Sequence, residues 1–189
     1  MLDNPNPKPI YNSAIAVANW LITMNRADPS DLTHLKIQKM LYFAQGWHLA
    51  HFDFPLFEDP IEAWKHGPVV RSVYWELKSY SKDDSITELI EGYTLNGFDY
   101  EALGTPEMLF FCDKAKDLML SVWDEYAKQS AWDLVSITHA KDSPWDKVAN
   151  ALPNRMTASE NEWGGDYYDL IIPIELMKSY FKKYLPHDN

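Results

Sequence analysis

The sequence contains one cysteine, Cys112, among its 189 residues. A single cysteine cannot form an internal disulfide, and it excludes metal sites that are built from several thiolates. Such low cysteine usage is typical of a reducing compartment, so we expect the chain to act in the cytoplasm. Cys112 falls on the apolar face of a predicted helix, which favours a packed thiol over a nucleophile.

Long apolar runs are also missing from the sequence. No window approaches the roughly 20 apolar residues that a membrane-spanning helix needs, so no membrane association is expected. The first residues show no apolar stretch after a basic segment, and we therefore expect no signal peptide. The glycines are few and form no phosphate-binding pattern, and nothing else in the sequence predicts a cofactor.

Basic residues are under-represented, with 17 Lys and Arg against 28 Asp and Glu, which gives a net charge of −11. An acidic surface repels phosphate backbones and favours basic partners, so nucleic acid is disfavoured as a ligand. Aromatic residues, in contrast, make up 14% of the chain and include eight Trp. Side chains of this size need a large interior or a contact surface, which points weakly to a protein partner.

Length and composition predict one globular domain over residues 1–189, and we find no internal repeat or domain boundary. Residues 1–11 have three prolines and read as an extended lead-in, whereas the polar residues 153–169 read as a surface loop. Between these segments the apolar residues recur mostly at helical spacing. We therefore predict a mainly α fold of about six to seven helices with a minor β pair.

The central element of this fold is a predicted helix at about residues 33–51. Ile37 and Met40 lie on one stripe of this helix, whereas Tyr42 and Leu49 lie nearly opposite. A helix that is apolar nearly all round belongs in the middle of a bundle. Gly46 is unfavourable within a helix, and we expect it to let another backbone approach closely.

The other helices are predicted from caps, prolines and periodicity. Their expected ranges are 13–25, 68–77 with Pro68 at the first position, 105–127, 130–139, 143–152 and a last helix from residue 173. Alternation at residues 61–64 predicts a short strand that pairs with residues 170–172. In the last helix the buried side is predicted to comprise Ile174, Met177, Tyr180, Phe181 and Tyr184.

Histidines provide two candidate chemical sites, and both have simpler interpretations. His48 and His51 have the spacing of a chelating pair, but no third ligand lies nearby, so we expect core or interface histidines and no metal. His139 follows Ser136 by three residues at a helix end, a position without a nucleophile elbow or oxyanion hole. A capping or buried polar role for His139 is the better interpretation, and no catalytic residue is predicted.

Charged residues within the apolar segments are also ambiguous. Glu58, Asp59 and Glu62 are better interpreted as a solvated rim than as an acid–base pair. Lys36 and Lys39 on the central helix either extend toward solvent from the edge of a bundle or recognise an acidic group.

Ordered motifs make the chain resemble the Panacea domain of the SocA-like antitoxin family, whose members include phage-associated proteins. The resemblance rests on Leu35–Trp47, Pro55–Phe57, Ile61–Val70 and Tyr74, followed by Trp123, Ser130–Ala131, Leu134, Thr138–His139 and Pro144–Trp145. The family usually has an aromatic residue at the position of His48 and commonly Tyr at that of His66. The match spans about residues 13–148.

The resemblance implies a non-enzymatic antitoxin that neutralises a protein toxin encoded by the adjacent gene. In the SocA branch of the family the antitoxin acts as an adapter that delivers its toxin to a ClpXP-type protease, and elsewhere direct binding suffices. We expect a basic toxin, because this chain is acidic. The candidate partner-binding residues are Lys36, Lys39, Tyr42, Gln45, Trp64, His66, Val69, Tyr74, His139 and Trp145.

Five of these candidates, Lys36, Lys39, Gln45, Trp64 and His66, are not required by the helical packing pattern, so function is expected there first. Two other functions stay open at this point. One is a phage-encoded or prophage-encoded regulator that binds a host protein or nucleic acid, and the other is a hydrolase that uses His139, His66 or the His48 pair. The oligomeric state is also open.

Overall fold

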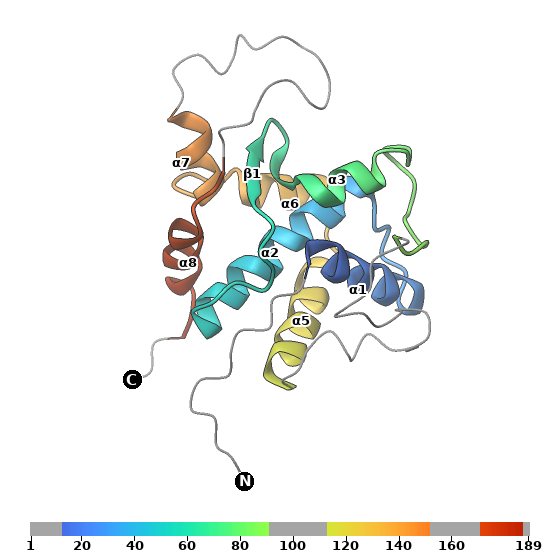
Figure 1. The fold of residues 1–189 in the computed structure, drawn as a ribbon, viewed down its shortest axis with the longest axis horizontal. Helices are drawn as coiled ribbons and strands as arrows, with labels where there is room; N and C mark the ends of the chain where they lie inside the picture. Colours follow the sequence, from blue (N-terminus) through green and yellow to red (C-terminus); the bar gives the residue numbers. More distant parts are fainter. Residues whose placement is uncertain (1–12, 91–112, 152–170, 187–189) are drawn as a thin grey trace.

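The long helix α2 (His34–Phe52) lies at the centre of the computed structural model, which describes residues 13–90, 113–151 and 171–186 (Figure 1). The other elements are α1 (Ala14–Ala27), β1 (Ile61–Trp64), β2 (Gly67–Val70), α3 (Arg71–Leu77), α5 (Asp113–Tyr126), α6 (Ala131–Thr138), α7 (Pro144–Asn150) and α8 (Ile174–Lys182). Fifteen of the 19 residues of α2 are buried, and α1, α3, α5, α6, α8 and β2 all pack on it. The predicted central helix is therefore confirmed.

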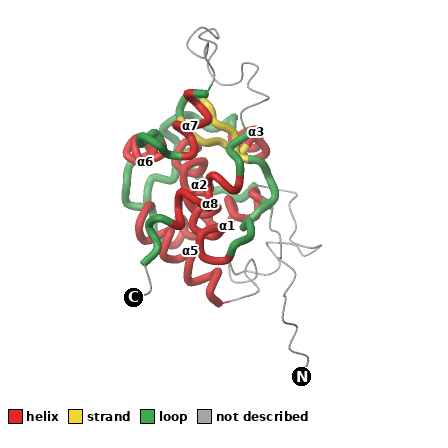
Figure 2. Tube along the Cα trace, turned by 90° about the vertical axis from the view of Figure 1, so that its left-hand side faces the viewer, coloured by secondary structure: helices red, strands yellow, loops and turns green. Residues whose placement is uncertain are grey.

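The mainly α prediction is also confirmed, because the described residues form seven helices and a single two-stranded sheet (Figure 2). None of the described helices is both long enough and apolar enough to span a membrane. The predicted lead-in (1–11) and surface loop (153–169) lie outside the described residues, as do residues 105–112 of one predicted helix. The assignment of residues 1–189 to one domain stays a prediction.

Helix starts follow the caps that the sequence predicts. Ser13 begins α1, and its side chain accepts a hydrogen bond from the Ala16 amide. Ser130 and Asp133 form a complete capping box at the start of α6, while Ser143 caps α7 with Pro144 at the first position. These boundaries agree with prediction because a cap is formed by residues only three apart in sequence.

The predicted helix start at Pro68 is wrong. Residues 67–70 instead form strand β2, which pairs antiparallel with β1 across a two-residue turn, and helix α3 begins only at Arg71. Gly67 has a φ of +96°, which a residue with a side chain rarely adopts. Residue pairs in an antiparallel sheet alternate between hydrogen-bonded and non-hydrogen-bonded positions. The pair Ala63–Pro68 falls at a non-hydrogen-bonded position, where the N–H that proline lacks is not needed.

The predicted pairing of residues 61–64 with 170–172 is only partly right. An isolated antiparallel bridge joins Glu62 to Ile171, and the Ile172 amide donates to the Ile61 carbonyl at 2.8 Å. The main partner of β1 is nevertheless β2. A hairpin partner lies closest in sequence, and the two-residue turn holds it in register.

Helix α8 packs on α2 through a narrower face than its sequence predicts. Met177 and Phe181 are buried and Tyr180 is half-buried, but Ile174 and Tyr184 are exposed. The Phe181 ring fills the space beside Gly46, where an added Cβ would lie 2.2 Å from the ring. Gly46 therefore accommodates a side chain, and the prediction that it would accommodate a backbone is wrong.

Candidate partner-binding surface

Two polar side chains of α2 bind the outer edge of strand β2. The Gln38 Oε1 accepts a hydrogen bond from the Val70 amide at 2.7 Å, and the Lys39 Nζ donates to the Pro68 carbonyl at 2.8 Å. Both backbone groups belong to non-hydrogen-bonded pairs of the hairpin and point away from β1. The two side chains thus provide hydrogen-bond partners for backbone groups at the strand edge that would otherwise be unpaired.

Lys39 is fully buried, and within the described residues no carboxylate forms an ion pair with it. Burial lowers the pKa of its amine from 10.5 to about 7. Its aliphatic stem lies beneath Gly67, where an added Cβ would come within 2.9 Å of Cε. Lys39 therefore supports the hairpin from below and does not reach the surface.

Two further candidates on α2 bind the backbone of irregular segments. The Gln45 Oε1 accepts from the Leu56 amide at 2.7 Å, and its Nε2 donates to the Phe57 carbonyl at 2.9 Å. Lys36 donates to the carbonyls of Ser30 and Ala127, the latter just after the end of α5. On folding, these backbone groups lose their hydrogen bonds to water, and the polar side chains of α2 replace those hydrogen bonds.

Tyr42 belongs to the core, where it contacts the rings of Phe43 and Phe181 edge-on. Lys36, Lys39, Tyr42 and Gln45 are all buried, and each is explained by packing or hydrogen bonding within the fold. The premise that packing does not require Lys36, Lys39 and Gln45 is therefore wrong. In this conformation none of the four presents a surface to a partner.

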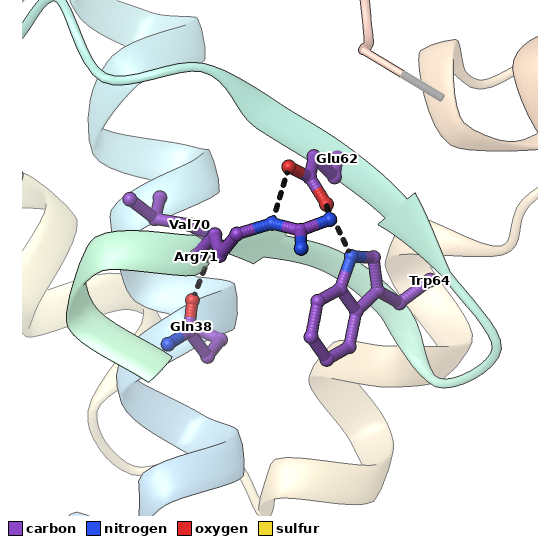
Figure 3. Close-up of polar contacts among 5 residues, drawn as sticks. All are labelled: Gln38, Glu62, Trp64, Val70 and Arg71. Carbon is purple, nitrogen blue, oxygen red and sulfur yellow. Dashed lines mark hydrogen bonds and ion pairs between the residues drawn. The ribbon is translucent and has the colours of Figure 1, made fainter. Parts of the chain in front are cut away.

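A polar cluster on the hairpin holds Trp64 in place (Figure 3). The Glu62 carboxylate accepts the Trp64 indole N–H at 2.7 Å and binds the Arg71 guanidinium through both oxygens, at 2.8 and 2.7 Å. The guanidinium also lies over the Trp64 ring, 5.6 Å from its centroid. Glu62 is buried, so its assignment to a solvated rim is wrong.

Trp64 packs with two other candidates into a small apolar cluster. Trp64, Val69 and Tyr74 are all buried and form a cluster separate from the main core. The rings of Trp64 and Tyr74 lie 4.8 Å apart. This cluster joins the hairpin to α3 and leaves little of these three candidates open to a partner.

The last three candidates, His66, His139 and Trp145, lie around the hairpin turn and are only partly buried. Trp145 stacks on His139 with ring centroids 3.6 Å apart, and its indole donates to the Trp64 carbonyl at 2.8 Å. On the other side of the turn, His66 meets Trp132 at right angles, with centroids 5.8 Å apart. We call these four residues (His66, Trp132, His139, Trp145) the hairpin corner.

Trp132 is absent from the residues that the sequence predicts for partner binding. It is 61% exposed, the same fraction as Tyr184 and more than the other large apolar side chains on the described surface. A signal for it exists in the sequence, because Leu134, Val135 and Thr138 define the buried side of α6 and Trp132 lies outside it. An exposed Trp next to a conformationally fixed pair of rings makes the hairpin corner the best candidate surface.

Lysine residues lie near His66 in the hairpin corner, although the chain as a whole is acidic. Burial lowers the pKa of His66, and the nearby charges of Lys65, Lys39 and Lys82 lower it further. Lys65 and Lys82 are exposed. The lowered pKa favours the neutral form of the His66 ring.

Catalytic and metal-binding alternatives gain no geometric support from the described residues. The Ser136 hydroxyl donates to the Trp132 carbonyl at 3.0 Å, and His139 caps the end of α6. The His48 Nδ1 lies 2.9 Å from the Phe54 carbonyl, and burial lowers the pKa of this ring, while His51 is exposed. No group of three potential metal ligands occurs in the part of the chain that the structure describes.

Comparison with known proteins shows the family of this chain. The family model described as "Antitoxin SocA-like, Panacea domain" matches residues 37–146, which is more than half of the chain. The chain belongs to the SocA-like antitoxin family. It is 32% identical to Antitoxin SocA of Caulobacter vibrioides over 137 residues, which cover 72% of this chain and 70% of that protein. No solved structure matches the chain significantly.

The Panacea-domain match includes every residue of the hairpin corner. It runs from the first turn of α2 through the hairpin, α3, α5 and α6 to the start of α7. Helices α1 and α8 lie outside the matched residues. The family resemblance of the sequence is thus confirmed, and it covers the part of the fold that forms the candidate surface.

Proposed function

We propose that this chain is a non-enzymatic antitoxin that binds a cognate protein toxin through the hairpin corner and neutralises it in the cytoplasm. Membership of the SocA-like family supports the antitoxin role. The observation that carries the assignment of the surface is Trp132, which is 61% exposed and meets His66 edge-on. The toxin is the product of the adjacent gene.

The physical basis for this surface is the energy of burying large rings that are already held in place. Trp residues are enriched among the few interface residues that supply most of the binding energy. Trp145 is fixed by its hydrogen bond to the hairpin and by its stack on His139, so little side-chain freedom is lost on binding. A partner that covers Trp132 would bury this exposed ring.

Co-expression with the adjacent reading frame tests both the role and the surface. The wild-type chain should co-purify with that gene product and restore growth, whereas Trp132→Ala should weaken binding by about 30-fold or more. Trp75→Ala is the matched control, because Trp75 is an exposed Trp on α3 outside the hairpin corner.

Two results would contradict the proposal in different ways. If the adjacent gene product is harmless alone and does not bind the wild-type chain, the antitoxin role fails. If binding survives Trp132→Ala but is lost in Trp75→Ala, the antitoxin role stands and the surface is wrongly placed.

Neutralisation can follow either of two routes, direct blocking of the toxin or its delivery to a protease. The lifetime of the toxin in cells separates them, since only delivery shortens that lifetime when the antitoxin is present. We expect the shortening to disappear in cells without a ClpXP-type protease if the chain is an adapter.

A further inference from the structure

A second candidate contact lies on the other side of α2, between this helix and α5. The groove there has a volume of about 320 Å³, which is near the lower end of the range for small-ligand sites, about 300–1,000 Å³. Its lining includes Trp47 and His51 from α2 and Leu118, Val122, Glu125 and Tyr126 from α5. We call it the α2–α5 groove. The hairpin lies above α2 and α5 lies below it in both views (Figures 1 and 2).

The walls of the groove are aromatic and held in position. The Trp47 indole donates to the Tyr126 hydroxyl at 2.9 Å, and its ring packs edge-on against Phe181 with centroids 5.2 Å apart. Tyr126 stacks on Phe43, with centroids 4.1 Å apart and ring planes within 6°. Fixed aromatic rings that line a groove attract cations through their negative faces.

One carboxylate lines this groove. Glu125 is exposed at the end of α5, and within the described residues its side chain has no hydrogen-bond or ion-pair partner. Glu125 lines the groove together with Tyr126, the next residue of α5, and its charge adds to the burial that raises the pKa of Tyr126. An unpaired carboxylate next to aromatic rings is complementary to a planar cation, which stacks on the rings while it binds the carboxylate.

We propose that the α2–α5 groove binds an arginine side chain of the toxin, with the guanidinium paired to Glu125 and lying against Trp47 and Tyr126. The proposal deepens the proposed function and rests on it for the identity of the partner. It also gives the acidic chain, with its net charge of −11, a defined point at which to recognise a basic protein. Arginine is favoured over lysine because its flat guanidinium can stack and bind the carboxylate through two hydrogen bonds.

The first test uses small probes and requires no toxin. The indole N–H signal of Trp47, assigned with Trp47→Phe, is followed by NMR during titration with N-acetyl-arginine amide at about pH 8, where histidines are neutral. We expect this signal to shift with the arginine probe and to stay in place with the citrulline analogue, which has the same shape without the charge. Glu125→Gln should weaken the response about fivefold, and Asp124→Asn, the same charge change one residue away, should not.

The second test uses the adjacent gene product and the same two variants. Glu125→Gln should weaken its binding about fivefold, and Asp124→Asn should leave the binding unchanged. Equal shifts with arginine and citrulline, or equal affinities for the two variants, would overturn the groove as an arginine site. If the wild-type chain and Asp124→Asn both fail to bind the gene product, the antitoxin role fails instead, so the two failures are distinguishable.

Discussion

The hairpin corner and the α2–α5 groove lie on opposite sides of one helix and differ in charge. Lysines lie near His66 at the corner, whereas the groove is lined by a carboxylate that has no partner among the described residues. The corner also rests on a buried polar network, which includes Lys39 beneath Gly67 and Glu62 bound to Arg71. The groove instead rests on stacked aromatic rings.

The two regions show that a polar residue on a central helix can either bind buried backbone groups or reach solvent. Polar side chains of α2 that face the hairpin form hydrogen bonds to its backbone. They support the hairpin corner but are buried and do not form part of its surface. Near the end of the helix, Trp47 and His51 reach solvent themselves. The two regions should therefore respond differently to substitution.

Removal of the Glu62 carboxylate should have the largest effect, and it should be confined to the corner. In Glu62→Ala the Arg71 guanidinium and the Trp64 indole lose their acceptor, and we expect the free energy of unfolding to fall by about 3 kcal/mol. Urea unfolding measures this loss, with Glu58→Ala as the control because Glu58 is an exposed acid nearby. A fall of the same size in both variants would show that the hairpin cluster has no special role.

Gly46→Ala should damage the groove side of the molecule. The new methyl group would clash with the Phe181 ring, which also supports Trp47, so we expect a loss of about 1–3 kcal/mol on unfolding. In the double variant with Phe181→Ala, the Gly46→Ala change should have little further effect, because the clash is gone. Strict additivity of the two losses would contradict this account.

Lys39 should make stability depend on pH in a window that no carboxylate shares. The folded chain releases this proton near pH 7, whereas the unfolded chain keeps it up to about 10.5. Between these values the unfolded state binds more protons, so the free energy of unfolding should rise with pH. Lys39→Met should reduce the rise between about pH 7 and pH 9, as measured by urea unfolding at each pH. An identical rise in both proteins would argue that Lys39 stays charged when folded.

The smallest effect is expected at Asp53, which joins the end of α2 to α8. Hydrogen bonds from Lys182 and Lys178 lower the pKa of this carboxyl from 3.8 to about 2. Its contribution to stability is present above pH 3.8 and is lost as the pH falls toward 2. In Asp53→Asn the free energy of unfolding should therefore change less with pH in this range. Because the carboxyl is exposed, salt should reduce the difference between the two proteins. Acid unfolding at low and high salt measures it.

Much of the helical scaffold is predictable from the chain, but the hairpin is not. Gly67 and Pro68 are compatible both with the first turn of a helix and with a tight hairpin. The choice depends on Lys39 and Gln38, which bind the carbonyl of Pro68 and the amide of Val70 from a helix about 30 residues earlier. No pattern local to residues 61–77 contains that information.

The candidate surface was predicted less completely than the scaffold. His66, His139 and Trp145 were identified through the family resemblance, and the structure places all three beside the hairpin turn. That they bind a partner stays a prediction. Trp132 was missed, and seven of the ten candidates are buried. The sequence does not show whether a polar or aromatic residue on an apolar helix faces solvent or a buried carbonyl.

Local sequence was sufficient to predict the mainly α class, the capped starts of α1, α6 and α7, and the central position of α2. Caps and helical periodicity depend on residues only a few positions apart, so a short stretch contains the whole interaction. Tertiary structure alone decided that Gly67–Val70 is a strand, that Phe181 fills the space at Gly46, and that Lys39 lies inside the protein. Each of these outcomes depends on a contact between segments distant in sequence, and such contacts form only when the chain is packed.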